Sequence, residues 1–237
     1  MALPHRKSVV YNLTIPSNKT KVKYRPFLVK DEKSLLLAQQ SEDADVMLDT
    51  LKDIIKSCIQ TNIDVDSLAI FDIEYIFTQI RAKSVGEEVE LLFRCQHCTD
   101  EKATVKIKFD LTNINITFDP KHNKKIPLFD DVGIVLKYPN IDIIKKIDGL
   151  NLNDIDTLFD IVIECIDYIY DSEELYYAKE QTRKELEEFL NNLDSEQFLK
   201  IQEFFETMPK MMQEVNYTCP VCNASNHMVL EGLESFF

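Results

Sequence analysis

Two Cys-x-x-Cys pairs constrain this chain more than any other feature of its sequence. Cys95 and Cys98 form the first pair, Cys219 and Cys222 form the second, and 120 residues lie between Cys98 and Cys219. Two intervening residues let both sulfurs of a pair reach one metal ion from a tight turn, and four thiolates suit the tetrahedral preference of zinc. We therefore predict one structural zinc site with all four cysteines as ligands. Such a closed site leaves no position for a catalytic water.

Strand-like sequence surrounds each cysteine pair. Residues 89–94 lead into the first pair and 103–109 lead out of it with period-two alternation, while 215–218 and 228–230 surround the second pair. Each pair is therefore expected to form a zinc knuckle in a hairpin, and the two knuckles together a zinc-ribbon-like site. Because a compact ribbon has far fewer residues between its pairs, the metal is expected to clamp the ends of a long insertion.

Apolar residues at helical spacing dominate most of the remaining chain. They predict helices over 32–40, 41–58 and 67–83, and three helical stripes between 155 and 208. Shorter stretches predict strands over 8–15, 21–29, 115–118 and 133–138. The expected fold class is α+β and mostly helical, with a zinc-ribbon-like pair of cysteine knuckles and a long helical insertion.

These patterns divide the chain into five expected segments. They are a basic extended N-terminal arm (1–30), an N-terminal helical unit (31–87), a first zinc-knuckle hairpin with further strands (88–140), a helical insertion (141–213), and a second zinc-knuckle hairpin that completes the zinc site (214–237).

The charge of the chain is unevenly distributed. Its 237 residues carry a net charge of −14, yet the first thirty hold seven Lys and Arg and no acid, so the rest carries −21. An acidic body repels phosphate backbones, which disfavours nucleic acid as the main partner. The basic arm is left with three interpretations: it binds RNA, it binds an acidic surface of this chain or of a partner, or it is simply solvated.

Motifs of common enzymes and membrane proteins are missing from the sequence. It contains no G-x-G-x-x-G, phosphate-binding loop, G-x-S-x-G or H-E-x-x-H, and only four histidines. No apolar run approaches the roughly 20 residues of a membrane helix, and the N-terminus has no apolar core of signal-peptide length. We expect no enzymatic activity, no small-molecule substrate and no membrane partner.

Four other residues could take part in metal or thiol chemistry. His97 lies inside the first pair and His227 lies five residues after Cys222, so either could substitute as a ligand. Cys58 and Cys165 lie on or beside apolar helix faces, where cysteine is usually a core residue.

Arg25 and Phe27 are candidate partner-binding residues. Pro26 fixes its own φ and biases Arg25 towards an extended backbone, which presents both side chains on an edge segment. That segment could join a partner's sheet or lie against the acidic body of this chain. We predict that Arg25 forms a bidentate pair with a carboxylate, either within the chain or across an interface.

Phe204 and Phe205 raise a similar question within the last helical stripe. Adjacent helical residues point about 100° apart, so one packed face cannot bury both rings. Either one ring belongs to a docking surface, or a second neighbour in the same chain covers it.

Two stretches carry a family resemblance. The first comprises Pro16-Ser17-Asn18, Lys23–Lys33 and Leu35–Ala38, and the second comprises Phe71–Phe77 and Arg81–Glu87. Together with the cysteine pairs they resemble the baseplate hub assembly proteins of T-even-type phages. The resemblance covers most of the chain and is most specific in residues 16–98.

The resemblance implies a non-enzymatic protein that helps build the baseplate hub of a contractile-tailed phage. Its implied partners are other hub or tail proteins, and its implied location is the host cytoplasm during assembly or the tail baseplate of the virion. Such a protein either stays in the particle or leaves it as a chaperone. Two alternatives stay open: a zinc-ribbon nucleic-acid-binding or transcription accessory protein, and a thiol oxidoreductase using its Cys-x-x-Cys pairs.

Overall fold

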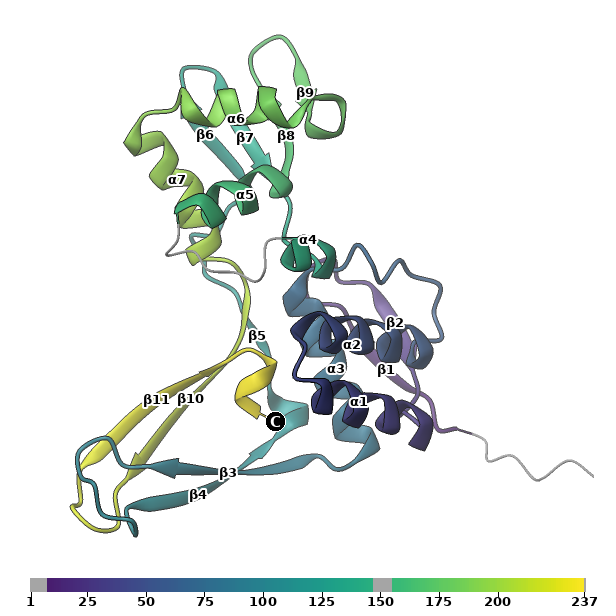
Figure 1. Ribbon diagram of the computed structural model, residues 1–237, viewed down its shortest axis with the longest axis vertical. Helices are drawn as coiled ribbons and strands as arrows, with labels where there is room; N and C mark the ends of the chain where they lie inside the picture. The colour runs from purple at the N-terminus through teal and green to yellow at the C-terminus, as the bar shows by residue number, and fades with distance from the viewer. Residues whose placement is uncertain (1–7, 147–154, 237) are drawn as a thin grey trace, which may run out of the picture. The chain divides into compact units, whose positions relative to one another are not determined.

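The chain folds into two compact units, which Figure 1 shows in a computed structural model describing residues 8–146 and 155–236. Unit 1 combines the chain up to Val65 with Phe71–Thr117 and the segment from Lys210 onward. Unit 2 comprises Asp66–Ile70 and Phe118–Pro209. Unit 1 is therefore assembled from segments that are distant in the sequence.

Three helices and a small hairpin form one part of unit 1. The hairpin pairs β1 (Tyr11–Thr14) with β2 (Lys21–Tyr24), and the helices are α1 (Val29–Ser41), α2 (Ala44–Cys58) and α3 (Ile70–Ser84). α2 begins where the Asp43 side chain accepts hydrogen bonds from two backbone N–H groups, and it buries an apolar stripe that includes Ile55. The buried Asp72 carboxylate of α3 accepts a hydrogen bond from the Ser17 N–H at 3.0 Å, which fixes the hairpin against the helix.

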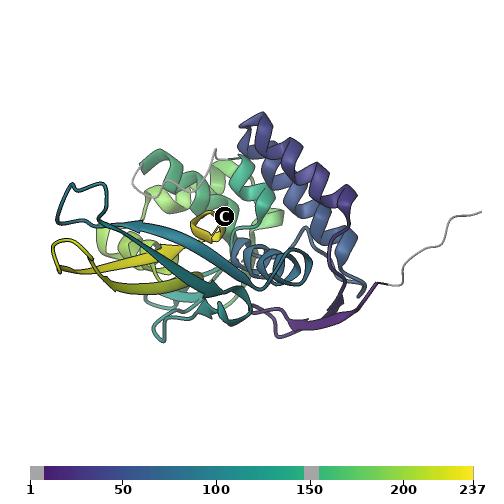
Figure 2. The ribbon, with the colours of Figure 1, turned by 90° about the horizontal axis from the view of Figure 1, so that it is seen from below.

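Two small sheets form the other part of unit 1. One pairs β3 (Glu88–Arg94) with β4 (Thr104–Asp110), and the other has the order β11-β10-β5, with β5 at Ile116–Thr117, β10 at Lys210–Thr218 and β11 at Ser225–Glu231. The β3–β4 and β10–β11 hairpins lie side by side in both ribbon views (Figures 1 and 2). Their facing sides share one apolar cluster, which includes Phe93, Tyr217 and Leu230.

Short 3-10 helices and polar side chains join these parts of unit 1. The 3-10 helices are η1 (Leu111–Asn113) and η3 (Leu233–Phe236). Gln79 of α3 donates a hydrogen bond to the Leu111 carbonyl at 3.2 Å, and Glu74 of α3 accepts one from the Leu233 N–H at 3.2 Å. Hydrogen bonds therefore link α3 both to the segment that follows β4 and to the segment that follows β11.

Unit 2 is built on a four-stranded antiparallel sheet in sequential order. Its core joins side chains of the sheet to side chains of four helices, α4, α5, α6 and α7. The elements are β6 (Lys125–Phe129), β7 (Val132–Leu136), α4 (Ile141–Lys146), α5 (Ile155–Cys165), β8 (Ile166–Tyr170), β9 (Leu175–Tyr177), η2 (Ala178–Glu180), α6 (Arg183–Asn191) and α7 (Ser195–Glu206).

The prediction of a mostly helical, zinc-ribbon-like fold is wrong. Helices account for 40% of the structure, and the strands form four antiparallel sheets. The two cysteine-bearing hairpins belong to separate sheets and do not form one ribbon. The insertion between them is not simply helical, because it contains the four-stranded sheet of unit 2.

The error has a local cause in each missed strand. Ile166 and Ile169 continue the spacing of the α5 stripe, but the helix ends at Cys165 and they lie in β8. The β-branched and aromatic residues of β8 favour a strand, and pairing with β7 decides the outcome. β6 contains Pro127, which is tolerated because β6 lies at the edge of its sheet.

No helix in residues 8–146 or 155–236 is both long enough and apolar enough to cross a membrane.

Phe204 and Phe205 are both buried in unit 2, at 2% and 1% exposure. Their rings meet edge to face at a centroid distance of 5.0 Å, and the same apolar cluster covers both. A neighbour within the chain therefore covers the second ring, and the docking alternative is excluded.

We expect Phe205→Ala to destabilise unit 2 by about 3–5 kcal/mol, because it removes a fully buried ring and leaves a cavity. The matched control is Leu199→Ala on the same helix, since Leu199 is 61% exposed. The free energy of unfolding of this control variant should stay within about 0.5 kcal/mol of the wild-type value. Urea unfolding followed by circular dichroism measures both, and equal effects of the two variants would contradict this core.

His122 lies in a cluster of three mutually contacting rings in unit 2: it stacks on Tyr138 with centroids 5.5 Å apart and meets Phe204 at a tilt with centroids 4.9 Å apart. Its Nδ1 lies 3.0 Å from the Thr207 hydroxyl, while its Nε2 is buried with no hydrogen-bond partner among the described residues. Burial lowers the pKa of His122, and nearby Lys124 lowers it further against an opposing effect of Asp119.

The unfolded chain therefore takes up a proton at His122 at pH about 6.5, whereas the folded chain takes it up only at a lower pH. The free energy of unfolding should fall as the pH drops through this range. We expect His122→Phe to reduce that pH dependence, as measured by thermal melts between neutral and mildly acidic pH. His97→Phe is the control, and an equal reduction in both variants would contradict the role of His122.

Candidate metal centre

The two cysteine pairs occupy the turns at the tips of the β3–β4 and β10–β11 hairpins of unit 1. Cys95 and Cys98 lie between β3 and β4, and Cys219 and Cys222 lie between β10 and β11. Both turns begin alike: the Cys95 N–H bonds to the Ala103 carbonyl at 2.8 Å, and the Cys219 N–H bonds to the Ala224 carbonyl at 2.9 Å. The first cysteine of each pair is thus the last residue bonded across its hairpin before the turn, although the first turn is three residues longer.

The four sulfurs converge on one point. Cys95 Sγ lies 3.7 Å from Cys222 Sγ, Cys98 Sγ lies 3.8 Å from Cys219 Sγ, and all four lie within 4.8 Å of one another. A tetrahedron with zinc–sulfur bonds of about 2.3 Å has sulfur–sulfur edges of about 3.8 Å. The spacing therefore matches a tetrahedral thiolate site, and it is far longer than the roughly 2.05 Å of a disulfide bond.

Backbone amides point at the first sulfur of each pair. The His97 N–H donates to Cys95 Sγ at 3.3 Å, and the N–H groups of Val221 and Cys222 donate to Cys219 Sγ at 3.4 and 3.5 Å. Hydrogen bonds of this kind stabilise a thiolate and orient it as a metal ligand.

The thiols of the cluster differ in their affinity for protons. Burial raises the pKa of Cys95, but hydrogen bonds from the His97 N–H and from neighbouring thiols outweigh burial and lower the pKa to about 6. Burial and hydrogen bonds to neighbouring sulfurs raise the pKa of Cys98 to about 12. A cation bound at the centre replaces the protons held between these sulfurs.

Two side chains of the second hairpin hold the first hairpin in place beside the cluster. The Tyr217 hydroxyl donates to the Arg94 carbonyl at 2.7 Å. The Asn226 amide oxygen accepts from the Gln96 N–H at 2.9 Å, and Asn226 is only 3% exposed. Neither residue was predicted as part of the site; the sequence signal for Asn226 is a polar residue in line with the apolar positions of β11.

The other candidate ligands lie outside the cluster. Among the described residues, the metal-ligating group of unit 1 consists of the four cysteines. His227 lies on β11 with its Nε2 3.8 Å from Glu214, and His97 contributes its backbone N–H. Cys58 and Cys165 are fully buried, Cys58 at the end of α2 and Cys165 at the end of α5.

Arg25 and Phe27 lie far along the chain from the cysteines and contact the helices of unit 1. Arg25 Nη1 lies 3.2 Å from Asp31 Oδ2, which is one contact in place of the predicted bidentate pair. The Phe27 N–H donates to the Ser84 hydroxyl at 2.9 Å. The carboxylate partner of Arg25 therefore lies within the chain.

Comparison with known proteins identifies the family. Neither the curated proteins nor the solved structures contain a match to this chain. A family model described as T4 bacteriophage base plate protein matches residues 8–237, which confirms the resemblance found in the sequence. With almost its entire length matched, the chain belongs to the T4 bacteriophage base plate protein family.

Proposed function

We propose that this protein is a non-enzymatic subunit or assembly chaperone of the baseplate hub of a contractile-tailed phage, and that a structural zinc ion holds its two cysteine hairpins together. The family match over residues 8–237 carries the proposal. Its partners are other hub or tail proteins. It acts in the host cytoplasm during assembly and, if it is a subunit, remains in the tail baseplate.

The packing at the hairpin tips supports a metal with a structural role. Besides the cysteines, the apolar cluster at the tips contains only Ala103 among the described residues. So small a cluster contributes little apolar burial, whereas a structural zinc site contributes on the order of 10 kcal/mol at neutral pH. Four cysteine ligands also complete the coordination of zinc, which favours a structural site over a catalytic one.

The two alternative functions have less support. A nucleic-acid-binding zinc ribbon is disfavoured because the hairpins belong to separate sheets and the chain beyond the first thirty residues carries −21. A thiol oxidoreductase is disfavoured because the four sulfurs form one cluster instead of two separate redox pairs. Salt-dependent titration with RNA and DNA tests the first alternative.

We expect one zinc ion per chain, measured by elemental analysis of protein purified without chelator. Cys95→Ser and Cys219→Ser should abolish binding and lower the melting temperature and solubility, because each removes a ligand from the cluster. The matched control is Cys58→Ala, which removes a buried cysteine outside the cluster and should keep the zinc. Wild-type protein without zinc, or Cys95→Ser protein with full zinc, would contradict the proposed site.

The assembly role is tested by complementation. Phage lacking this gene should form complete baseplates when the host supplies the wild-type or Cys58→Ala protein, and fewer when it supplies Cys95→Ser. Electron microscopy of the particles provides the readout. Normal baseplates without any copy of the protein would reject the proposed function.

We further propose that Arg25 and Phe27 prepare the basic arm for contact with a partner by fixing its base on the helices. Asp31 is 7% exposed and accepts hydrogen bonds from Arg25, from the Leu28 N–H at 2.8 Å and from the Ser57 hydroxyl at 3.2 Å. Arg25 also donates to the Pro26 carbonyl at 2.8 Å. These contacts fix the C-terminal end of the arm, of which residues 11–24 form the β1–β2 hairpin packed in unit 1.

Asp31→Asn is expected to cost about 1–3 kcal/mol of folding free energy, because an amide cannot accept all of these hydrogen bonds. Arg25→Lys should cost less and should change assembly more than folding if the arm binds a partner. Urea unfolding and complementation, with the solvent-exposed Lys33→Arg as control, separate the two effects. If Arg25→Lys and Phe27→Ala both assemble normally, neither residue serves partner binding.

A further inference from the structure

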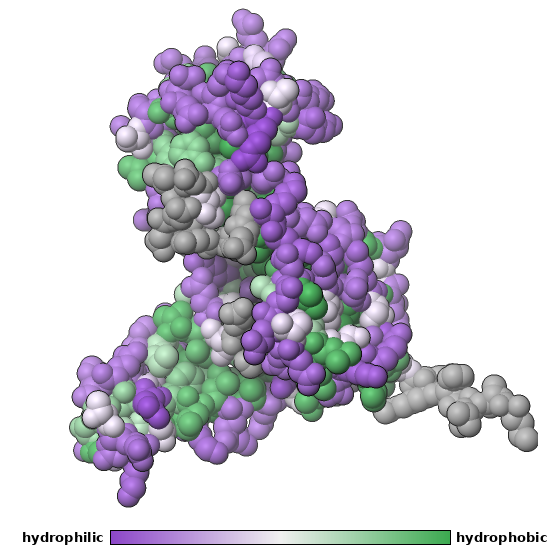
Figure 3. All heavy atoms as spheres, viewed as in Figure 1, coloured by the Kyte–Doolittle hydropathy of each residue, from purple (hydrophilic) through white to green (hydrophobic). Residues whose placement is uncertain are grey.

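An apolar groove in unit 1 lies beside the free edge of β3. It has a volume of about 360 Å³. In Figure 3, apolar surface gathers over the part of unit 1 that holds the two hairpins. The residues that line the groove come from β3, the turn that follows it, β11 and η3: Leu91, Leu92, Phe93, Arg94, Gln96, Met228, Leu230 and Ser235.

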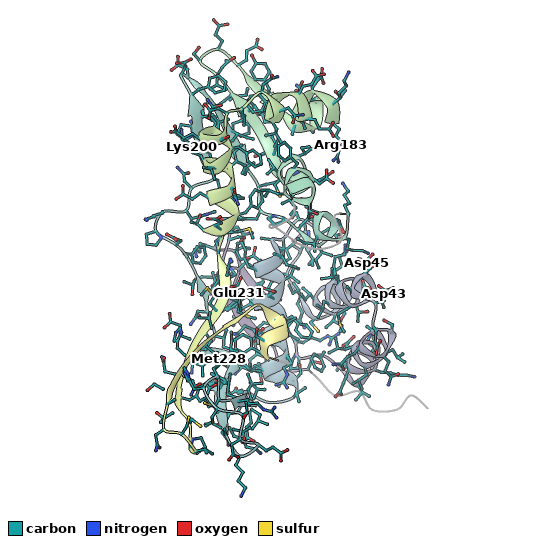
Figure 4. All side chains as sticks on the ribbon, turned by 60° about the vertical axis from the view of Figure 1, so that its left-hand side comes forward. Asp43, Asp45, Arg183, Lys200, Met228 and Glu231 are labelled. Carbon is teal, nitrogen blue, oxygen red and sulfur yellow. The ribbon has the colours of Figure 1, made fainter. Side chains whose placement is uncertain are left out.

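The lining residues show how the groove is oriented. Four successive residues of β3, from Leu91 to Arg94, line it, and successive side chains of a strand point to opposite faces. A cavity can therefore meet all four only along the edge of the strand. From β11 it meets Met228 and Leu230, which are two residues apart and share one face (Met228 is labelled in Figure 4). The edge of β3 therefore lines one side of the groove, and the face of β11 that carries Met228 and Leu230 lines its base.

The register of β3 shows which backbone groups face this groove. The Cys95 N–H bonds to Ala103 and the Glu87 carbonyl accepts from Leu111, both across the β3–β4 hairpin. Since hydrogen-bonding direction alternates along a strand, the odd-numbered residues of β3 pair with β4. The N–H and C=O groups of Glu88, Glu90 and Leu92 therefore point to the free edge.

The same edge is already closed at its metal end. There, the Arg94 carbonyl accepts from Tyr217 and the Gln96 N–H donates to Asn226, so two side chains take the place of a neighbouring strand. No such partner reaches the edge groups of Glu88, Glu90 and Leu92 from within the described chain. Leu92 is 63% exposed.

We propose that this edge binds an extended segment of another protein, which adds a third strand to the β3–β4 sheet and covers Met228 and Leu230. This inference rests on the proposed function only in taking the partner to be another baseplate protein. β-strand addition supplies main-chain hydrogen bonds, while alternate side chains of the added strand fill the apolar groove.

The charged residues of β3 indicate which side chains the added strand carries. Glu90 and Glu88 lie on the solvent-facing side of β3 and pair with Lys106 and Lys108 of β4 at 2.9 and 3.2 Å. A Lys or Arg on the added strand extends this alternation of charge, and opposite charges across strands are stabilising. The partner segment therefore carries basic residues on one face and apolar residues on the other.

A second copy of this chain fits the edge poorly. Antiparallel pairing of two copies over the whole stretch Glu88–Leu92 places Glu90 opposite Glu90 of the other copy. Like charges directly opposite destabilise a strand pair. The net charge of −14 adds to this repulsion and favours a basic partner.

The test uses the full chain and the synthetic peptide acetyl-Thr-Val-Lys-Val-Lys-Val-Thr-amide. Amide hydrogen exchange, measured by NMR, should be fast at Glu88, Glu90 and Leu92 in the free protein and slow at the odd-numbered residues between them. Adding the peptide should slow exchange at the three edge amides. A matched peptide with Glu in place of both Lys should bind at least tenfold more weakly.

Leu92→Pro removes one edge N–H without touching the bonds to β4, and it should weaken peptide binding about tenfold, or about 1.4 kcal/mol. Leu92→Thr is the matched control, because it keeps the N–H and should bind the peptide within a few-fold of the wild type. Both variants should keep the melting temperature and cysteine-cluster metal content of the wild type, which verifies that they fold.

Four results would overturn the proposal. They are slow exchange of the edge amides in the free protein, no binding of the basic peptide up to its solubility limit, equal binding of the two peptides, and wild-type binding by Leu92→Pro. Slow exchange that depends on protein concentration would identify a second copy as the occupant and would also reject the proposal. None of these results bears on the complementation by Cys95→Ser, so the proposed function stands or fails separately.

Discussion

The contact between the tips of the two cysteine hairpins is the interaction on which the β part of unit 1 depends. It joins residues separated by 120 positions, and closing so long a loop costs about 4 kcal/mol of chain entropy. Apolar packing at the tips offsets little of this cost, since it consists of the cysteines and Ala103; the larger apolar cluster with Phe93, Tyr217 and Leu230 joins the same two hairpins farther from the tips. The proposed metal, bound by four thiolates, would exceed the cost of closing this loop by several kcal/mol.

The ends of the insertion are joined a second time, away from the metal. β5 pairs with the start of β10 through Thr117 with Lys210 and Ile116 with Met211. The chain therefore leaves unit 1 and returns to it on neighbouring strands, and the segment between them can form a core of its own. Short strands at the base and thiolates at the tip act at opposite ends of β10, which restricts rotation of one hairpin against the other.

The sequence predicted the elements and ligands that depend on local pattern. The apolar stripe that ends at Cys58 predicted α2, although the helix begins at Ala44, after the capping Asp43, and not at residue 41. The two-residue spacing of each cysteine pair predicted the group of four cysteines that could hold a metal ion. β8 was missed because Ile166 and Ile169 satisfy helical spacing, and only pairing with β7 makes the segment a strand. Tyr217 and Asn226 were missed because their hydrogen bonds cross between hairpins that are remote in sequence, and no local pattern encodes such a contact.

The metal site and the open edge of β3 are consequences of one register. The bond from the Cys95 N–H to Ala103 aligns the hairpin so that both sulfurs of the first pair emerge at its tip. It also directs the backbone groups of Glu88, Glu90 and Leu92 away from β4. A slip of one residue reverses the faces of every side chain, removing Phe93 from the core as well as misplacing Cys95. The constraint that gathers the four sulfurs thus also determines which face of β3 is apolar and which of its amides remain available to a partner.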